Sequence, residues 1–326
     1  MICLGIESTA HTFGCGIVDS KGRILANEKD SFTTEKGGII PSDAKLHHQK
    51  VKDSVVDTAL STANVTFEEI DLVSFSQGPG IAPCLLVGMK KAKEIAGKYN
   101  KPLVGVNHCI AHLEIGKLMT GAKDPILLYA SGANTQVIGY EAKKFRVFGE
   151  TLDQGVGNFI DSFARYVHLG FPGGPKIEKL SLDGANYIEL PFVVKGMDVS
   201  YSGILTSLKQ KFDSGKYKLE DLAFSLQETA YAMLVEVSER AMAHCSKNEL
   251  LLGGGVACNK RLQEMCRIMC KERNAKFFAP KNEFLVDNGA MIAWLGILQK
   301  KSATKEYDKI DIRPYERTDD VNVDWK

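Results

Sequence analysis

Apolar residues along the chain follow two periods, and the two kinds of segment alternate. Short apolar runs bounded by turn residues predict strands, and runs with apolar residues at every third or fourth position predict helices. Strands are predicted within residues 1–28, as a hairpin, and at 72–76, 102–106, 126–131, 135–140, 145–149, 249–255 and 276–279. Helices are predicted at 43–63, 84–99, 154–168, 176–181, 202–212, 219–246 and 286–300, and from His108 and Asn259 onward. This alternation predicts an α/β architecture.

Polar residues suggest where several of these elements begin or end. Asp43 is expected to cap the helix through Ala63. The apolar face of that helix is predicted to comprise Val51, Val55, Val56, Ala59 and Leu60. Residues 36–41 are predicted to form a loop, and the polar tail at residues 311–326 is expected to lie at the periphery.

Two segments of the chain repeat one another. Residues 4–17 and 127–140 align without gaps and share Leu4/Leu127, Ser8/Ser131, Ala10/Ala133, Thr12/Thr135 and Gly16/Gly139. Each is predicted to form a strand, a tight turn rich in hydroxyls and small residues, and a second strand. Such a turn directs backbone N–H groups and hydroxyls at an anion. Two such turns, one in each half of a duplicated fold, would hold a phosphate chain from both sides.

Composition narrows the classes of protein to consider. The chain has 326 residues, with 41 Lys and Arg against 40 Asp and Glu, so its net charge is +1. A bulk basic field is absent, and any contact with nucleic acid must be local or shared with partners. The lysines between residues 90 and 101 fit either a solvated helix face or a phosphate-tracking patch.

Cysteine spacing and hydropathy predict the compartment. The eight cysteines include no CxxC pair, which predicts buried thiols in a reducing compartment. The N-terminus lacks the basic region of a signal peptide, and no apolar stretch approaches the length of a membrane span. We therefore expect a soluble, cytoplasmic protein with no membrane partner.

The most specific chemical signal is a pair of histidines. His108 and His112 are four residues apart, so they share one face of a helix and could supply two ligands of a divalent metal. The alternative is a pair of partly exposed helix histidines. The pattern resembles the HExxH of zinc proteases, but Cys109 stands where the general-base glutamate would be. A protease of that type is therefore disfavoured.

Other residues that could bind a metal or a nucleotide are weaker signals. Asp287 could be a ligand or the N-cap of the following helix, and Tyr129 could be a ligand or a core aromatic. Glu178 and Asp161 could accept hydrogen bonds from ribose hydroxyls or could be solvated surface charges. The glycines at residues 253–255 leave room for a flat base or simply end a strand.

Longer motifs resemble one known family. They lie at residues 5–14, 76–80, 106–112, 149–153, 155–158, 194–200, 225–229, 252–257, 259–262 and 284–294. In this order they resemble the TsaD-type tRNA N6-adenosine threonylcarbamoyltransferases. The resemblance is to the archaeal and eukaryotic branch, whose members are catalytic subunits of the KEOPS complex. It extends from residue 2 to the tail.

The resemblance implies a fold and a set of ligands. The fold would be a duplicated actin/Hsp70/sugar-kinase-like (ASKHA) α/β fold, with nucleotide and metal in the cleft between two lobes. Residues 1–121, completed by 288–326, would form the first lobe, and residues 122–287, with helical insertions, the second. One divalent metal, Fe²⁺ in preference to Zn²⁺, would be held by His108, His112, Tyr129 and Asp287. ATP or threonylcarbamoyl-AMP would contact Tyr129, Ala130, Ser131, Gly132, Ala133, Asp161, Gly174, Glu178 and Asn259.

The resemblance also implies a reaction and partners. The threonylcarbamoyl group would pass from threonylcarbamoyl-AMP to N6 of the adenosine 3′ of the anticodon, in tRNAs that read codons starting with A. Besides tRNA, the partners would be a small dimerising subunit and a small atypical kinase/ATPase, which some archaea fuse to the C-terminus. Two alternatives are an ATP-binding metalloprotein scaffold without intrinsic catalysis and a small-molecule kinase. The kinase gives no reason for a metal site built on histidines.

One departure from the family pattern bears on the nucleotide site. The family has glycine where this chain has Ala133, in the turn at residues 131–135. Alanine resists positive φ, so this residue bears on the backbone geometry of the turn and through it on the affinity for phosphate.

Overall fold

The chain folds into two compact units. The structure, a computed structural model, describes residues 1–34 and 38–325. The first unit comprises Met1–Phe32, Ile39–Met119 and Asp287–Lys326, and the second comprises Thr33–Gly38 and Thr120–Val286. Among the described helices, none is long and apolar enough to cross a membrane.

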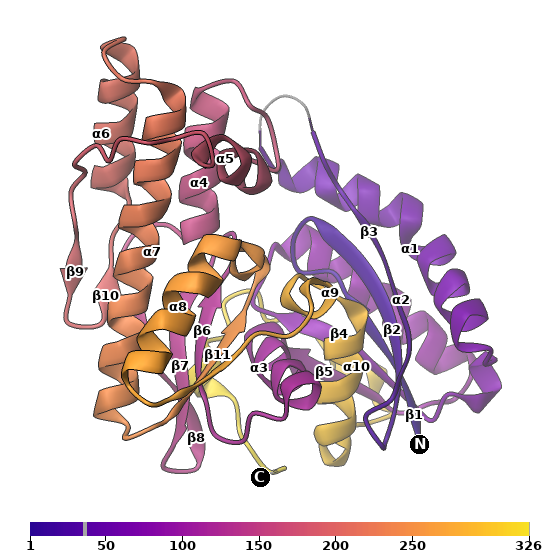
Figure 1. Ribbon diagram of the computed structural model, residues 1–326. Coiled ribbons are helices and arrows are strands. Elements are labelled where there is room, and N and C mark those ends of the chain that lie inside the picture. Colours follow the sequence, from indigo (N-terminus) through magenta and orange to yellow (C-terminus); the bar gives the residue numbers. More distant parts are fainter. Residues whose placement is uncertain (35–37, 326) are drawn as a thin grey trace. The chain divides into compact units, whose positions relative to one another are not determined.

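The first unit is built on a five-stranded mixed sheet in the order β3-β2-β1-β4-β5 (Figure 1). Its strands are β1 (Ile2–Glu7), β2 (Thr12–Asp19), β3 (Ile24–Ser31), β4 (Leu72–Gly78) and β5 (Leu103–Asn107). Its helices are α1 (Pro41–Ala63), α2 (Ala82–Lys98), α3 (His108–Thr120) and α10 (Gly289–Leu298), with short 3₁₀ turns at Phe67–Glu69, Lys300–Ser302, Tyr307–Lys309 and Thr318–Asp320. Strand β1 runs antiparallel to β2 but parallel to β4, which is parallel to β5.

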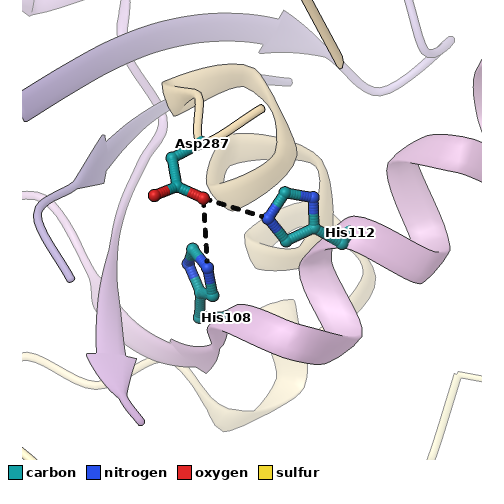
Figure 2. A group of neighbouring side chains, drawn as sticks. All are labelled: His108, His112 and Asp287. Atoms are coloured by element: carbon teal, nitrogen blue, oxygen red, sulfur yellow. Dashed lines mark hydrogen bonds and ion pairs between the residues drawn. The ribbon is translucent and has the colours of Figure 1, made fainter. Parts of the chain in front are cut away.

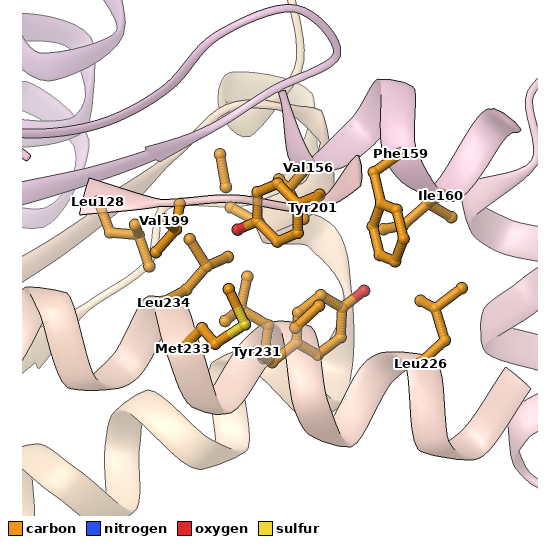
Figure 3. Close-up of a cluster of buried hydrophobic side chains, with 14 of the residues drawn as sticks. Leu128, Val156, Phe159, Ile160, Val199, Tyr201, Leu226, Tyr231, Met233 and Leu234 are labelled. Atoms are coloured by element: carbon orange, nitrogen blue, oxygen red, sulfur yellow. The ribbon is translucent and has the colours of Figure 1, made fainter. Parts of the chain in front are cut away.

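The second unit has its own five-stranded sheet, in the order β12-β11-β6-β7-β8. Its strands are β6 (Ile126–Ala130), β7 (Thr135–Glu141), β8 (Lys144–Glu150), β11 (Glu249–Gly253) and β12 (Lys276–Phe278), with a separate pair β9 (Val194–Lys195) and β10 (Asp198–Val199). Its helices are α4 (Val156–Tyr166), α5 (Gly174–Ser181), α6 (Ser202–Asp213), α7 (Leu219–His244), α8 (Lys260–Glu272) and α9 (Asn282–Leu285), with a 3₁₀ turn at Gly255–Cys258. Helix α7 carries much of the apolar core, where Phe159 stacks on Tyr201 (Figure 3).

The two sheets share one topology, which confirms the duplication predicted from the repeat. In each, an antiparallel meander (β1-β2-β3 or β6-β7-β8) is extended from its first strand by two parallel strands (β4-β5 or β11-β12). The repeated segments at residues 4–17 and 127–140 fall on β1–β2 and β6–β7. The predicted α/β class is confirmed.

Glycines bring α10 against the sheet of the first unit. A Cβ added at Gly5 would lie 2.2 Å from the backbone nitrogen of Ala293, and one at Gly16 would lie 2.1 Å from that of Ala290. Because strand residues alternate between faces, Leu4, Ile6 and Ile17 point to the opposite face, where they join the core of α1 and α2. Backbone therefore touches backbone where α10 begins, just after Asp287.

Three predicted features are corrected by the structure. The first helix begins at Pro41 and not at Asp43, and its N-cap Ile40 has no side-chain cap. Proline suits the first helical position because its φ is preset and no N–H is needed there. The last long helix begins at Gly289 rather than residue 286, because Asn288 caps it. Within the predicted loop at 36–41, residues 36 and 37 lie outside the described residues.

The C-terminal tail is the third correction. It was expected to be peripheral, yet Thr318 is 1% exposed, and the backbone N–H of Arg313 donates to the carbonyl of Gln77 on β4. The indole of Trp325 donates to the carboxylate of Glu114 on α3. The polar composition of the tail did not predict these contacts, because they are hydrogen bonds and not the burial of apolar side chains. Residue 326 lies outside the described residues.

We expect Gly16→Ala to lower the free energy of unfolding by about 1–3 kcal/mol, because the backbone of α10 would have to move. Gly203→Ala on α6 is the matched control, since nothing lies within 4 Å of a Cβ there, and it should be neutral or stabilising by up to ~1 kcal/mol. Urea denaturation of both variants measures the difference. Equal stability of the two variants would contradict the packing described.

Candidate metal centre

Three side chains form the candidate metal centre, and two of them belong to the first two turns of α3. Asn107 ends β5, and its side-chain oxygen accepts hydrogen bonds from the backbone N–H groups of Cys109 (3.0 Å) and Ile110 (3.2 Å). This cap starts the helix at His108. His108 and His112, four residues apart, then share one face, and both are buried. The alternative of a pair of partly exposed helix histidines is wrong.

The third side chain precedes α10. Asn288 caps this helix by accepting from the N–H of Met291, so the N-cap role weighed for Asp287 belongs to its neighbour. The Asp287 carboxylate instead faces the histidines. Its Oδ1 atom lies 3.4 Å from Nε2 of His108 and 3.2 Å from Nε2 of His112 (Figure 2). The candidate ligand atoms of the three residues all lie within 4.8 Å of one another.

Behind this cluster lies a carboxylate that the sequence analysis assigned no role. Glu7, fully buried at the end of β1, accepts from the N–H and the hydroxyl of Thr9, both at 2.6 Å. Its other oxygen lies 2.9 Å from Nδ1 of His108. A carboxylate on the far nitrogen of a metal-binding histidine fixes its tautomer and ring orientation. The signal available was a charged residue in an otherwise apolar strand, since glutamate is rarely fully buried unless paired.

The charges at the centre favour a bound cation. Burial lowers the pKa of His112, which favours the neutral ring. Burial also opposes ionisation of Asp287, but the facing His108 and His112 outweigh it and hold the pKa of that carboxyl well below its ordinary value. When Nδ1–H of His108 donates to Glu7 and the ring is neutral, its Nε2 lone pair faces the carboxylate oxygen of Asp287. A proton on Nε2 or a metal ion between these two atoms would offset the charge of the carboxylate.

The donor set fits particular metals. Two imidazole nitrogens and one carboxylate oxygen form the set used by non-haem Fe²⁺ sites, and a similar set holds catalytic Zn²⁺. Both geometries leave coordination positions open for a substrate. Burial raises the pKa of the Cys109 thiol to about 11, and the group of candidate ligands among the described residues comprises His108, His112 and Asp287.

Tyr129, the fourth predicted ligand, belongs to the second unit. It lies on β6 and is 1% exposed, next to Ala130 and the turn at residues 131–134. The three residues brought together in the first unit are therefore His108, His112 and Asp287.

The turn after Tyr129 is held by the start of α4. The N–H groups of Gly157 and Asn158 donate to the carbonyls of Ser131 and Gly132. The φ of Ala133 is not positive, so the resistance of alanine to positive φ does not alter the turn. Gly254, by contrast, has φ +92°, and a Cβ there would lie 2.3 Å from the carbonyl oxygen of Ala130.

The remaining residues predicted to bind the nucleotide include three that hydrogen-bond to neighbouring segments of the second unit. Asp161 accepts from the N–H of Gly173 at 2.7 Å, and Glu178 accepts from that of Lys260 at 2.9 Å. Asn259 caps α8 and donates from its amide to Gln227. Neither carboxylate is simply a solvated surface charge. A Cβ at Gly174 would meet nothing within 4 Å.

Comparisons with known proteins give the following matches. The sequence model of one family, described as tRNA N6-adenosine threonylcarbamoyltransferase, matches residues 23–294. A relative of that name from Thermococcus kodakarensis is 56% identical, and one from Archaeoglobus fulgidus is 51% identical, each over the full length of both chains. A "probable bifunctional tRNA threonylcarbamoyladenosine biosynthesis protein" from Methanocaldococcus jannaschii is 51% identical over all of this chain and 60% of its own length.

Solved structures are similar in fold at low identity. HypF of T. kodakarensis matches with a TM-score of 0.63 and 15% identity, over 92% of this chain and 48% of that one. The activator of the 2-hydroxyisocaproyl-CoA dehydratase of Clostridium difficile matches with a TM-score of 0.57 and 12% identity, over 96% and 100%. These likenesses place the chain among actin-like ASKHA folds.

We expect Glu7→Gln to weaken metal binding by about 10–100-fold, because the carboxylate that orients His108 is lost. Glu94→Gln, an exposed carboxylate on α2, is the control and should bind like the wild type. Competition against a chelator, followed by metal analysis, measures both. Unchanged affinity in the Glu7 variant would contradict the role assigned to this residue.

Proposed function

The chain belongs to the tRNA N6-adenosine threonylcarbamoyltransferase family, and we propose that it takes the threonylcarbamoyl group from threonylcarbamoyl-AMP. The acceptor is N6 of the adenosine 3′ of the anticodon, in tRNAs that read codons starting with A. The observation that carries this proposal is the convergence of His108, His112 and Asp287 in a chain of this family. The transferase names of full-length relatives favour catalysis over an ATP-binding scaffold.

The metal-binding residues have separate tasks in this proposal. His108 and His112 offer their Nε2 lone pairs, Asp287 offsets positive charge, and Glu7 keeps His108 in the tautomer with Nε2 free to bind. Tyr129 is the proposed fourth ligand. A divalent metal held there, Fe²⁺ in preference to Zn²⁺, supplies a Lewis acid for the carbonyl or carboxylate of the threonylcarbamoyl group. Burial of both histidines keeps water away from the ligand atoms.

We assign the nucleotide to residues of the second unit. The turn formed by Ala130, Ser131, Gly132 and Ala133 would contact the phosphates through backbone N–H groups. Asp161 and Glu178 would accept from ribose hydroxyls, beside Gly174 and Asn259. The open space at Gly174 supports an approaching ligand there. In this proposal the two units are the two lobes of the duplicated fold, and ATP or threonylcarbamoyl-AMP is the nucleotide.

The partners follow from charge and from the family. A net charge of +1 gives no broad basic field, so other subunits would share the work of holding tRNA. We propose the subunits of a KEOPS complex, with a small dimerising protein and a small atypical kinase/ATPase, in the cytoplasm. The bifunctional name of the M. jannaschii relative, which extends beyond the part matched here, supports a fused second activity in such systems.

We expect a reconstituted transfer reaction to require His112. The chain, its partner subunits, a source of threonylcarbamoyl-AMP and unmodified tRNA should yield N6-threonylcarbamoyladenosine, measured by nucleoside mass spectrometry. His112→Ala should lower the rate by at least about 100-fold, since it removes a ligand of the Lewis acid. His244→Ala, an exposed histidine on α7, should act like the wild type. A His112 variant that lacks metal yet retains full activity would refute the scheme.

We expect Ala133→Gly to leave the affinity for ATP within about twofold, because the backbone at Ala133 is not in the left-handed region that favours glycine. Isothermal titration calorimetry with ATP measures this change. A large gain in affinity would show that alanine does constrain the turn.

A further inference from the structure

The C-terminal residues of the chain lie along α3, the helix that carries both histidines. We call residues 313–325 the C-terminal strap. Its Glu316 contacts Asn107, its Thr318 hydrogen-bonds Cys109, and its Trp325 donates to Glu114. These contacts meet the cap and the first two turns of α3 in chain order. The strap therefore touches α3 where His108 and His112 lie.

The hydrogen bond with Glu316 fixes the orientation of the buried side-chain amide of Asn107. The Asn107 oxygen accepts from two N–H groups of α3, while its Nδ2 donates to Oε2 of Glu316 at 3.0 Å. Asn107 is 2% exposed, so water does not readily replace either partner. Only one orientation of the amide satisfies both sides, because a carboxylate accepts and does not donate. Glu316 thus selects the orientation that caps the helix.

Glu316 is itself held in place. Its Oε1 accepts from Nη1 of Arg313 at 2.8 Å, and its backbone N–H donates to the Arg313 carbonyl. The N–H of Arg313 donates to the Gln77 carbonyl at 2.7 Å, and the N–H of Gly80 donates to the Pro314 carbonyl at 3.1 Å. The Glu316 side chain is only 10% exposed. The strap is therefore anchored on the end of β4, next to the strand that leads into α3.

We propose that Glu316 is a positioning residue of the metal centre, acting through Asn107. This inference rests on the proposed metal site. His108 directly follows Asn107, so a change in the cap shifts its backbone, whereas Glu7 holds only its ring. Metal ligands must be held within about 0.5 Å of their bound geometry, so a loose cap weakens the site. Glu316 and Glu7 fix the same histidine from its backbone and from its ring.

The test is a titration with Co²⁺ alone, followed by the visible spectrum of the bound ion and by chelator competition. Glu316→Ala should weaken Co²⁺ binding by about tenfold and alter the spectrum, as removal of an outer partner does. Glu316→Gln keeps an acceptor for Asn107 and should stay within about twofold of the wild type. Glu306→Ala is the control, because this carboxylate is exposed and forms an ion pair with Lys309.

A double variant covers the case in which Glu316→Ala does not fold. Asn107→Asp keeps the cap acceptor but places a second carboxylate against Glu316, so binding should weaken. When Glu316→Gln is added, the amide introduced at position 316 donates to the carboxylate introduced at position 107. This restores the hydrogen bond with donor and acceptor exchanged, so Co²⁺ binding should recover. Wild-type affinity and spectrum in Glu316→Ala, or no recovery in the double variant, would overturn the inference. Failure of the wild type itself to bind Co²⁺, or equal binding by His112→Ala, would instead overturn the proposed metal site.

Discussion

The candidate site depends on one buried hydrogen bond, between Glu7 and Nδ1 of His108. It decides which nitrogen of the ring carries hydrogen, and so which nitrogen faces Asp287. The buried Glu7 side chain accepts from the N–H and the hydroxyl of Thr9, and its other oxygen lies against Nδ1 of His108. In the neutral ring this places the Nε2 lone pair opposite the Asp287 carboxylate, where one metal ion would bind both groups. The sheet and helices of the first unit bring these groups together.

The sheet of the first unit explains why the groups meet. Strands β1, β4 and β5 are parallel, so their carboxyl ends lie along one edge. Glu7 ends β1, and His108 begins the helix that follows β5. The open end of a parallel sheet is where α/β proteins usually bind ligands. Glycines at positions 5 and 16 let α10 approach the sheet backbone to backbone, and Asp287 stands immediately before that helix.

Local periodicity predicted the elements well but not every contact. The repeat at residues 4–17 and 127–140 predicted the duplicated topology, because each turn joins the first two strands of a sheet. The predicted helix starts differ from Pro41 by two residues and from Gly289 by three. Each prediction placed the start beside an aspartate, Asp43 or Asp287, whereas Pro41 is the first residue of α1 and Asn288 caps α10. The roles of Glu7 and Glu316 were missed because each acts on a residue about 100 or 200 positions away. Such pairings depend on strand order, which no local pattern encodes.

The most direct test of the metal centre is X-ray diffraction from crystals grown with Fe²⁺, collected on both sides of the iron absorption edge. We expect an anomalous peak within about 2.0–2.2 Å of Nε2 of His108, Nε2 of His112 and a carboxylate oxygen of Asp287. A structure with these three side chains as described, no peak between them and the metal bound elsewhere would contradict their assignment as metal ligands.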